Sequence, residues 1–193
     1  MDGIIKERKN ELRKAALLTR GEIPSPEKAD MDGIICEKIA SLPEWKNASL
    51  ILVYASSRGE IDLGALYKSA KRDGKAIAFP RCLPGKEMEF AICEYRELSE
   101  GRFSIPEPPS AFSPIKVFPK DTLCILPCLI ANVNGFRVGY GGGYYDKFLS
   151  LHPITTVAAL YARFLTTDTD YKEPFDIPAD ILITEKETIR IEK

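Results

Sequence analysis

Two short apolar runs, SLILVYA (49–55) and KAIAFP (75–80), are separated by enough chain for one helix. The stretch between them, GEIDLGALYKSAKRDG, has turn-forming residues at both ends and a helical pattern in its middle. A continuous apolar run is typical of a strand that is covered on both faces. A strand, a helix and a second strand in this order form a βαβ unit, whose strands lie parallel with a right-handed crossover. The chain is therefore expected to fold around a parallel sheet.

Further strand patterns follow this unit. MEFAICEY (88–95) alternates apolar and polar residues, which predicts an edge or antiparallel strand. Residues 101–119 are rich in proline, which disfavours a helix or a central strand and predicts an ordered surface excursion. Three more apolar runs predict buried strands: TLCILP (122–127), TTVAALY (155–161) and DILIT (180–184).

The chain before the first strand has a helical pattern. Residues 4–20 place apolar side chains among lysines and arginines, and residues 22–42 again show helical spacing. A length of 193 residues suits one domain with a substantial core. We therefore expect a three-layer α/β/α fold with a mainly parallel sheet and an N-terminal helical pair, in one domain spanning residues 1–193.

Composition excludes several classes of function. The formal net charge is -1, so no global charge favours nucleic acid or an anionic membrane surface. No apolar run is long enough to span a membrane, and the first residues are polar rather than signal-like. The five cysteines include no CxxC pair, which indicates reduced thiols in a cytoplasmic protein. A single histidine, His152, rules out multi-histidine metal sites. We expect no nucleic-acid or membrane partner.

The segment RVGYGGGYYDKFL (137–149) is the strongest functional signal. It lies between the strand at 122–127 and a helix that begins near its tyrosine pair. Glycines before a helix N-terminus let an anion approach free backbone N–H groups and the positive end of the helix dipole. Ligands of open α/β sheets gather at the carboxyl ends of the strands, where this loop falls. Arg137 would add a bidentate phosphate donor.

Two readings of this segment stay open on the residues alone. It matches neither the dinucleotide fingerprint, since Tyr144 stands where the third glycine would be, nor the pattern GxxxxGK[ST]. The segment could therefore bind an anion or be a tight structural turn. Asp146 could hold a magnesium ion against a phosphate or interact with the helix dipole.

The segment resembles the signature of the 5-formyltetrahydrofolate cyclo-ligase family, also called 5,10-methenyltetrahydrofolate synthetases. The resemblance runs along nearly the whole chain in order. The other matching segments are KNELRK (9–14), VYASSRGEIDL (53–63), FPRC (79–82), LPCLIANVNG (126–135) and DIPADILIT (176–184).

This resemblance implies an ATP-dependent and Mg²⁺-dependent reaction of one-carbon metabolism. ATP phosphorylates the formyl oxygen of 5-formyltetrahydrofolate, and the bridging folate nitrogen attacks the activated carbon. Phosphate leaves, and 5,10-methenyltetrahydrofolate, ADP and orthophosphate are the products. Such chemistry needs alignment and cations rather than a histidine base. The resemblance also implies small-molecule partners, namely the folate and ATP, and a monomer.

The resemblance assigns roles to particular residues. Arg137, Tyr144 and Glu60 are the expected catalytic residues. The expected ATP-binding residues are Lys9, Arg13, Arg137, Val138, Gly139, Tyr140, Gly141, Gly142, Gly143, Tyr144 and Tyr145. The expected folate-binding residues are Tyr54, Ala55, Glu60, Arg81, Tyr140, Gly141, Gly142, Gly143 and Tyr144. The expected magnesium ligands are Asp146 and Asp180. Glu60 would accept hydrogen bonds from the amino and ring N–H edge of the pterin.

The chain departs from the family pattern at four positions. Asn132 stands where an aspartate is common, Val138 where a leucine is common, and Gly142 where other members carry a lysine. Phe175 precedes Asp176 where a polar residue is expected. Two alternatives therefore stay open beside the cyclo-ligase hypothesis. One is a non-catalytic nucleotide- or phosphate-binding α/β module, and the other is a divergent relative that has lost folate chemistry.

Overall fold

A computed structural model of the protein describes residues 2–57 and 59–192. Its main sheet has seven strands in the order β12-β11-β9-β6-β1-β2-β3. The five inner strands pair in parallel, and β3 and β12 pair antiparallel at the two edges. The strands are β1 Leu50–Leu52, β2 Ala76–Cys82, β3 Met88–Ile92, β6 Leu123–Pro127, β9 Thr155–Ala159, β11 Ile181–Ile183 and β12 Thr188–Arg190. The predicted α/β fold with a mainly parallel sheet is confirmed, including the antiparallel edge strand at 88–92.

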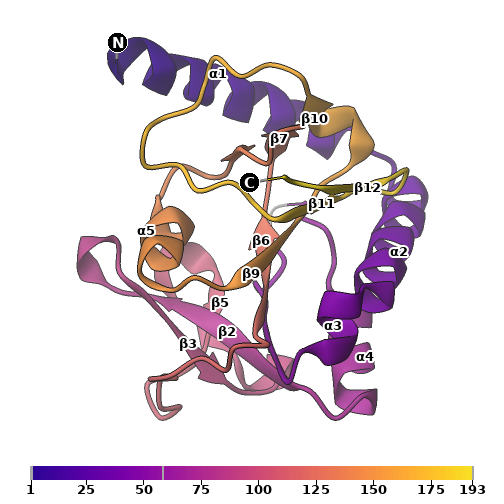
Figure 1. Ribbon diagram of the computed structural model, residues 1–193, viewed down its shortest axis with the longest axis vertical. Helices are drawn as coiled ribbons and strands as arrows, with labels where there is room; N and C mark the ends of the chain where they lie inside the picture. Colours follow the sequence, from indigo (N-terminus) through magenta and orange to yellow (C-terminus); the bar gives the residue numbers. More distant parts are fainter. Residues whose placement is uncertain (1, 58, 193) are drawn as a thin grey trace.

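The direction of winding reverses between β1 and β6. The connection from β1 to β2 runs through α4 (Gly64–Arg72), whereas the connection from β6 to β9 runs the other way through α5 (Tyr144–Leu151). Right-handed crossovers in opposite directions place their helices on opposite faces of the sheet. Figure 1 shows α4 and α5 on the two sides of β6. Such a reversal is where open α/β sheets bind ligands.

The predicted N-terminal helical pair is present. It consists of α1 (Asp2–Gly21) and α2 (Ser25–Ser41), and the short α3 (Pro43–Asn47) follows. Helix α2 packs on α3, α4 and β11, whereas α1 packs on the strands β7 and β8. In Figure 1, α1 crosses the top of the molecule, beyond the carboxyl ends of the parallel strands. This position makes α1 a candidate wall of a binding site.

The inner strands supply the core. Every residue of β1 and β11 is buried, as are Leu123 to Leu126 of β6. This burial on both faces is the physical reason for the continuous apolar runs in the sequence. All five cysteines are free thiols, and four of them are buried. His152 directly follows the last residue of α5, and the centroid of its ring lies 4.6 Å from that of Phe148.

Two smaller sheets extend the fold. The strands β10 (Leu165–Thr166), β7 (Ile130–Asn132) and β8 (Arg137–Val138) form one of them, in that order. The other pairs β4 (Ser99–Glu100) with β5 (Pro106–Glu107) within the proline-rich stretch, so part of the predicted excursion is a short hairpin. Short 3-10 turns lie at Pro84–Lys86, Tyr95–Glu97, Arg102–Ser104 and Ala162–Phe164. The sequence patterns did not predict the sheet of β7, β8 and β10.

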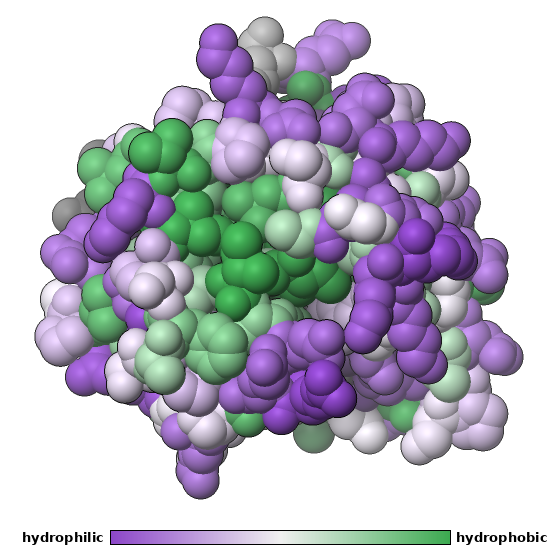
Figure 2. All heavy atoms as spheres, turned by 90° about the horizontal axis from the view of Figure 1, so that it is seen from below, coloured by the Kyte–Doolittle hydropathy of each residue, from purple (hydrophilic) through white to green (hydrophobic). Residues whose placement is uncertain are grey.

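An apolar area lies on the face opposite α1. Seen from below, hydrophobic residues gather in the middle of this face and hydrophilic residues surround them (Figure 2). It is therefore separate from the end of the sheet that α1 covers. None of the helices in the described part of the chain is long and apolar enough to cross a bilayer.

Replacement of Gly135 by alanine is expected to destabilise the protein. Gly135 has φ +85°, and a Cβ there would lie 2.7 Å from the carbonyl oxygen of Ala179. Gly74 is a matched control, because it has φ +68° but no atom within 4 Å of a Cβ. Gly74→Ala should lower the free energy of unfolding by about 1 kcal/mol through backbone strain alone. Gly135→Ala should lower it by about 3 kcal/mol or more, because a steric clash adds to the strain. Urea unfolding measures both, and equal losses would contradict the contact at Ala179.

Candidate functional site

The loop after β1 brings Glu60 to the winding reversal. The residue is only 8% exposed, and its Oε2 accepts hydrogen bonds from the backbone N–H of Ser57, at 2.8 Å, and from the Ser57 hydroxyl. Its Oε1 receives no hydrogen bond from any described residue. Burial raises the pKa of the Glu60 carboxyl, and the Ser57 N–H and the charge of Arg20 act against that rise. One carboxylate oxygen is thus fixed by the loop and the other is available.

The glycine loop between β8 and α5 presents a row of unused donors. Gly141 and Gly143 have φ values of +94° and +72°, which glycine adopts without strain. A Cβ on Gly142 would lie 2.7 Å from the Tyr144 ring, so a side chain there would displace that ring. The backbone N–H groups of residues 139–143 donate to no group in the described chain. Free N–H groups next to the N-terminus of an eight-residue helix form a setting suited to an anion.

Two cationic side chains lie against this loop. Nε of Arg13 donates to the Gly139 carbonyl at 2.8 Å, and its Cζ would lie 3.2 Å from a Cβ on Gly141. Nζ of Lys86 would lie 3.9 Å from a Cβ on Gly143. Lys86 comes from the turn between β2 and β3 and has φ +61°, which is uncommon for lysine. The structure therefore brings the predicted Arg13 to the loop and adds Lys86, which the sequence patterns did not single out.

Arg137 and Asp146 form a partly buried pair beneath the loop. Nη2 of Arg137 lies 3.1 Å from Oδ1 of Asp146, and Nη1 donates to the Ile177 carbonyl at 2.7 Å. The backbone N–H of Ile177 donates to the same Asp146 oxygen. The Arg137 side chain is 5% exposed and that of Asp146 is 26% exposed. The pair ties β8, α5 and the segment before β11 together, and Oδ2 of Asp146 keeps no partner among the described residues.

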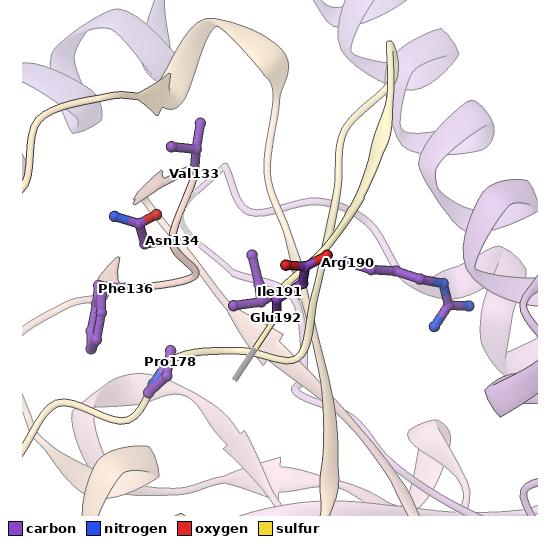
Figure 3. Close-up of a pocket in the computed structure, with 7 residues that line it drawn as sticks. All are labelled: Val133, Asn134, Phe136, Pro178, Arg190, Ile191 and Glu192. Carbon is purple, nitrogen blue, oxygen red and sulfur yellow. The ribbon is translucent and has the colours of Figure 1, made fainter.

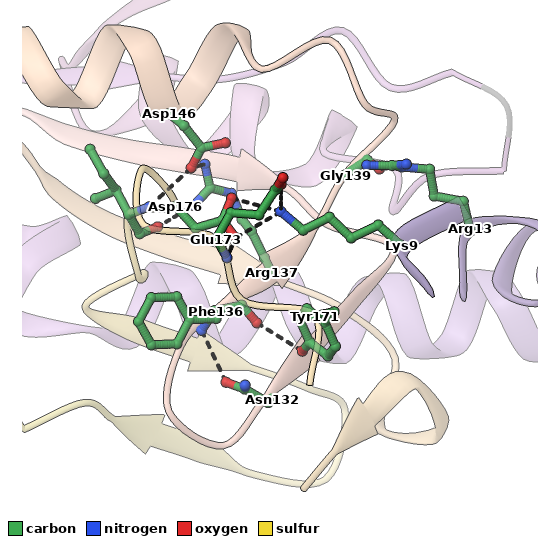
Figure 4. A network of polar contacts seen from close by, with 11 residues as sticks. Lys9, Arg13, Asn132, Phe136, Arg137, Gly139, Asp146, Tyr171, Glu173 and Asp176 are labelled. Carbon is green, nitrogen blue, oxygen red and sulfur yellow. Dashed lines mark hydrogen bonds and ion pairs between the residues drawn. The ribbon is translucent and has the colours of Figure 1, made fainter. Parts of the chain in front are cut away.

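Lys9 is held by two carboxylates, as Figure 4 shows. Its Nζ lies 2.5 Å from Oε2 of Glu173 and 2.7 Å from Oδ2 of Asp176. The lysine and the aspartate side chains are 7% and 8% exposed. The ammonium is thus paired with the chain's own acids, and its predicted role in binding ATP stays a prediction.

The two aspartates predicted to hold magnesium have different surroundings. Asp180 accepts hydrogen bonds from the backbone N–H and the hydroxyl of Thr156, at the beginning of β9. These contacts of Asp180 do not involve Asp146. Asp176, in contrast, directly precedes Ile177, whose backbone N–H donates to Asp146. Among residues 2–57 and 59–192, no group of three or more His, Cys, Asp or Glu side chains is arranged to hold a metal. A magnesium ion here would need phosphate oxygens or water as further ligands.

Arg81 lies near the end of β2 and bonds two neighbouring segments. Its Nε and Nη2 bond Glu89 on β3, and its Nη1 donates to the carbonyls of Pro108 and Pro109. Its Nη2 also donates to the Phe112 carbonyl, so Nη1 and Nη2 anchor the proline-rich segment while Nε bonds β3 alone. That Arg81 faces the folate stays a prediction. Tyr54, Ala55 and Val138, also predicted ligands, are at most 5% exposed and belong to the core.

Four buried polar atoms near Glu60 make no hydrogen bond to any described residue. The hydroxyls of Tyr140 and Tyr145 and two nitrogens of Arg20 have no partner in the described structure. Burial raises the pKa of both tyrosines. Tyr140 and Tyr145 were predicted site residues, but Arg20 was not. A signal existed, because Lys9, Arg13 and Arg20 are four and seven residues apart and thus share one face of α1.

Asn132 shapes the turn that leads into the site. Its Oδ1 accepts the backbone N–H groups of Asn134 and Phe136 at 3.1 Å, and its Nδ2 donates to the Asp168 carbonyl. An aspartate could not make the last of these bonds, because a carboxylate has no N–H. The hydrogen bond to the Asp168 carbonyl thus depends on the asparagine that stands here in place of the family's common aspartate.

Two surface hollows differ in their relation to these residues. One, of about 390 Å³, lies between the turn at Val133 and Asn134 and the chain end near Ile191, and contains no predicted site residue (Figure 3). The other, of about 370 Å³, is lined by Glu60, Ser57 and the ring of Tyr67, with five further residues. Only the second opens onto the site.

The site thus combines this fold with a glycine loop whose N–H donors are unused by the described residues and with the Glu60 carboxylate at the winding reversal. Known proteins are similar to this chain in sequence and in fold. Residues 5–182 match the model of the 5-formyltetrahydrofolate cyclo-ligase family. The chain belongs to this family. A probable 5-formyltetrahydrofolate cyclo-ligase of Schizosaccharomyces pombe is 28% identical over an alignment of 149 residues, and the match covers 74% of this chain and 72% of the relative. The 5-formyltetrahydrofolate cyclo-ligase of Mycoplasma genitalium is 28% identical over an alignment of 185 residues, and the match covers 91% of this chain and 96% of the relative.

Solved structures of cyclo-ligase relatives agree with the fold. The NMR structure of the 5,10-methenyltetrahydrofolate synthetase of Aquifex aeolicus superposes with a TM-score of 0.82 at 28% identity, and covers 96% of this chain and 93% of that one. A structure of the Mycoplasma pneumoniae synthetase superposes with a TM-score of 0.70 at 21% identity, covers 92% of this chain and 98% of that one, and supports the fold alone.

Replacement of Lys9 by methionine should destabilise this cyclo-ligase family member. The change leaves Glu173 and Asp176 facing each other without their cation, and breaking a buried ion pair costs about 3–5 kcal/mol. Lys14→Met is the matched control, because Lys14 is exposed on the same helix and such changes cost less than about 0.5 kcal/mol. Equal urea midpoints for the two variants would contradict the contacts of Lys9.

Proposed function

We propose that this protein converts 5-formyltetrahydrofolate to 5,10-methenyltetrahydrofolate with consumption of ATP. The γ-phosphoryl group passes to the formyl oxygen, and the bridging nitrogen of the folate attacks the formyl carbon. The bond from that carbon to the phosphorylated oxygen then breaks, and ADP and orthophosphate are released. Family membership supports this reaction. The observation that carries it is the set of five unused backbone N–H groups at residues 139–143 beside the N-terminus of α5.

The loop and its cations would bind the triphosphate. Backbone N–H groups and the helix N-terminus offer donors to the phosphate oxygens, and the guanidinium of Arg13 and the ammonium of Lys86 add positive charge. Arg137 lies beneath the loop and is bonded to Asp146, so we assign it the role of holding the loop and helix in position for phosphate. Phosphoryl transfer gains chiefly from such positioning and charge stabilisation.

Magnesium would be held at Asp146. Its Oδ2 has no described partner, whereas Asp176 is paired with Lys9 and Asp180 is engaged with Thr156. Mg²⁺ is commonly bound by one or two carboxylates with phosphates and water, which fits the absence of a closed ligand set among the described residues. When bound, the ion would neutralise charge on the phosphate oxygens.

Glu60 would bind the pterin. Its Oε1 is available in a hollow of suitable size, and an ionised carboxylate can accept from the neighbouring amino and ring N–H groups of a pterin. The rings of Tyr140 and Tyr144, which belong to the glycine loop, lie where folate and nucleotide would meet under this proposal. We further propose a monomeric, cytoplasmic enzyme of one domain with no nucleic-acid or membrane partner.

Turnover can be followed by the near-ultraviolet absorbance of methenyltetrahydrofolate, which 5-formyltetrahydrofolate lacks. Purified protein with ATP, Mg²⁺ and 5-formyltetrahydrofolate should show a rise in absorbance matched by ADP. Glu60→Gln should lower kcat/KM for the folate roughly 100-fold, because a charged acceptor is lost from a buried site. Glu187→Gln, at an exposed glutamate, should behave as the wild type. ATP binding without turnover would instead favour the non-catalytic module or the divergent relative.

Lys86→Asn should raise the KM for ATP about 5-fold, because a charge-assisted contact to phosphate is lost. Asparagine tolerates the positive φ of this turn, so the backbone should be kept. The KM for the folate and the melting temperature should not change. Lys120→Asn, at another exposed lysine, provides the comparison. An unchanged KM for ATP would remove Lys86 from the site.

A further inference from the structure

Arg20 lies buried where the winding of the sheet reverses. The residue is 4% exposed, although it is next to the last residue of α1. Its Nη2 donates to the carbonyl of Cys128, which directly follows β6, at 2.8 Å. Its Cγ and Cδ would lie 3.5 Å from a Cβ on Gly59, in the loop after β1. One side chain thus contacts the segments that follow both strands of the reversal.

The charge of Arg20 is not neutralised by an ion pair with any described residue. Its Nε and Nη1 are buried and make no hydrogen bond. The guanidinium carbon lies over the rings of Tyr161 and Phe164, 5.7 and 5.5 Å from their centres. A buried cation with unused donors is unfavourable compared with an apolar side chain that packs in the same place. Packing alone therefore does not explain an arginine at this position.

Two groups of the proposed folate site respond to this charge. Burial raises the pKa of Glu60, and Arg20 acts against that rise. Burial also raises the pKa of Tyr140, which Glu60 raises further and Arg20 lowers. The Tyr140 hydroxyl has no hydrogen-bond partner of its own. The positive charge of the Arg20 guanidinium therefore acts on two groups: the Glu60 carboxylate, which is proposed to bind the pterin, and the hydroxyl of Tyr140 in the glycine loop.

We propose that Arg20 is a positioning residue of the folate site, whose buried charge keeps the Glu60 carboxylate ionised and whose contacts hold the loop after β1 in place against β6. This inference rests on the proposed function. A pterin offers two adjacent N–H donors, and only an ionised carboxylate accepts both. A protonated Glu60 would present an O–H in place of one acceptor and would bind the same edge more weakly.

Other titratable and charged groups also face Glu60, and they stay unchanged when Arg20 is replaced. They are Tyr140 from the glycine loop, Tyr54 two residues after β1, Tyr145 from α5, and Lys28 and Asp62, which line the same hollow. A difference between variants at Arg20 therefore reports the guanidinium itself.

The test compares Arg20→Gln, Arg20→Lys and the wild-type protein. The measurements are kcat/KM for 5-formyltetrahydrofolate from pH 5.5 to 8 and the KM for ATP. In Arg20→Gln the acid limb of the folate profile should move upward by about one pH unit, because the carboxylate loses a stabilising charge. At neutral pH, kcat/KM for the folate should fall about 10-fold, while the KM for ATP stays within about 2-fold. Arg20→Lys should keep the acid limb near that of the wild type. Arg8→Gln, an exposed arginine of the same helix, should match the wild type.

Several outcomes would overturn the proposal. An unchanged acid limb in folded Arg20→Gln would do so, and so would equal losses for folate and ATP in both Arg20 variants, which would indicate a structural role. If Arg20→Gln does not fold, Arg20→Lys decides the matter. It keeps the buried charge, so its acid limb should match that of the wild type, and an upward shift of that limb would overturn the proposal. A wild-type protein that neither binds nor converts the folate would instead refute the proposed function, before any variant is measured.

Discussion

The reversal of winding between β1 and β6 is the constraint from which the rest of the site follows. Because the two crossover helices lie on opposite faces, the connections diverge at the carboxyl ends of these strands. The loop that carries Glu60 follows one strand. The small sheet that leads to the glycine loop follows the other. A carboxylate and a row of backbone donors, far apart in the sequence, are thereby brought to the same end of one sheet.

Helix α1 closes this end of the sheet with three cations from one of its faces. Lys9 pairs with acids of the segment before β11, Arg13 bonds the glycine loop, and Arg20 lies beneath the loop after β1. Each cation therefore meets a different part of the site. The helix contacts β7 and β8 rather than the main sheet, so its position depends on these polar contacts as well as on packing. This arrangement explains why a largely polar helix contains buried charges.

Much of the fold was predictable because its signals are local. Strands buried on both faces require continuous apolar runs, and the six main-sheet strands predicted from such runs or from alternation are present. The small sheet of β7, β8 and β10 was missed, because strands of two or three residues have no usable periodicity. In the site, the glycine loop was predictable from composition. The partners of Arg81 and Asp180 were not, since Glu89 and Thr156 meet them only through strand pairing and loop packing.

The sequence by itself determined the parallel sheet, the helical pair and the glycine loop before α5, because apolar runs, helical spacing and glycine act on neighbouring residues. Only the tertiary structure decided which charges pair with which. It paired Lys9 with Glu173 and Asp176, brought Lys86 to the glycine loop and buried Arg20 without an ion pair to any described residue. The physical reason is that the energy of a charge depends on its distance to other charges and on its burial. Both quantities arise only when distant segments pack together.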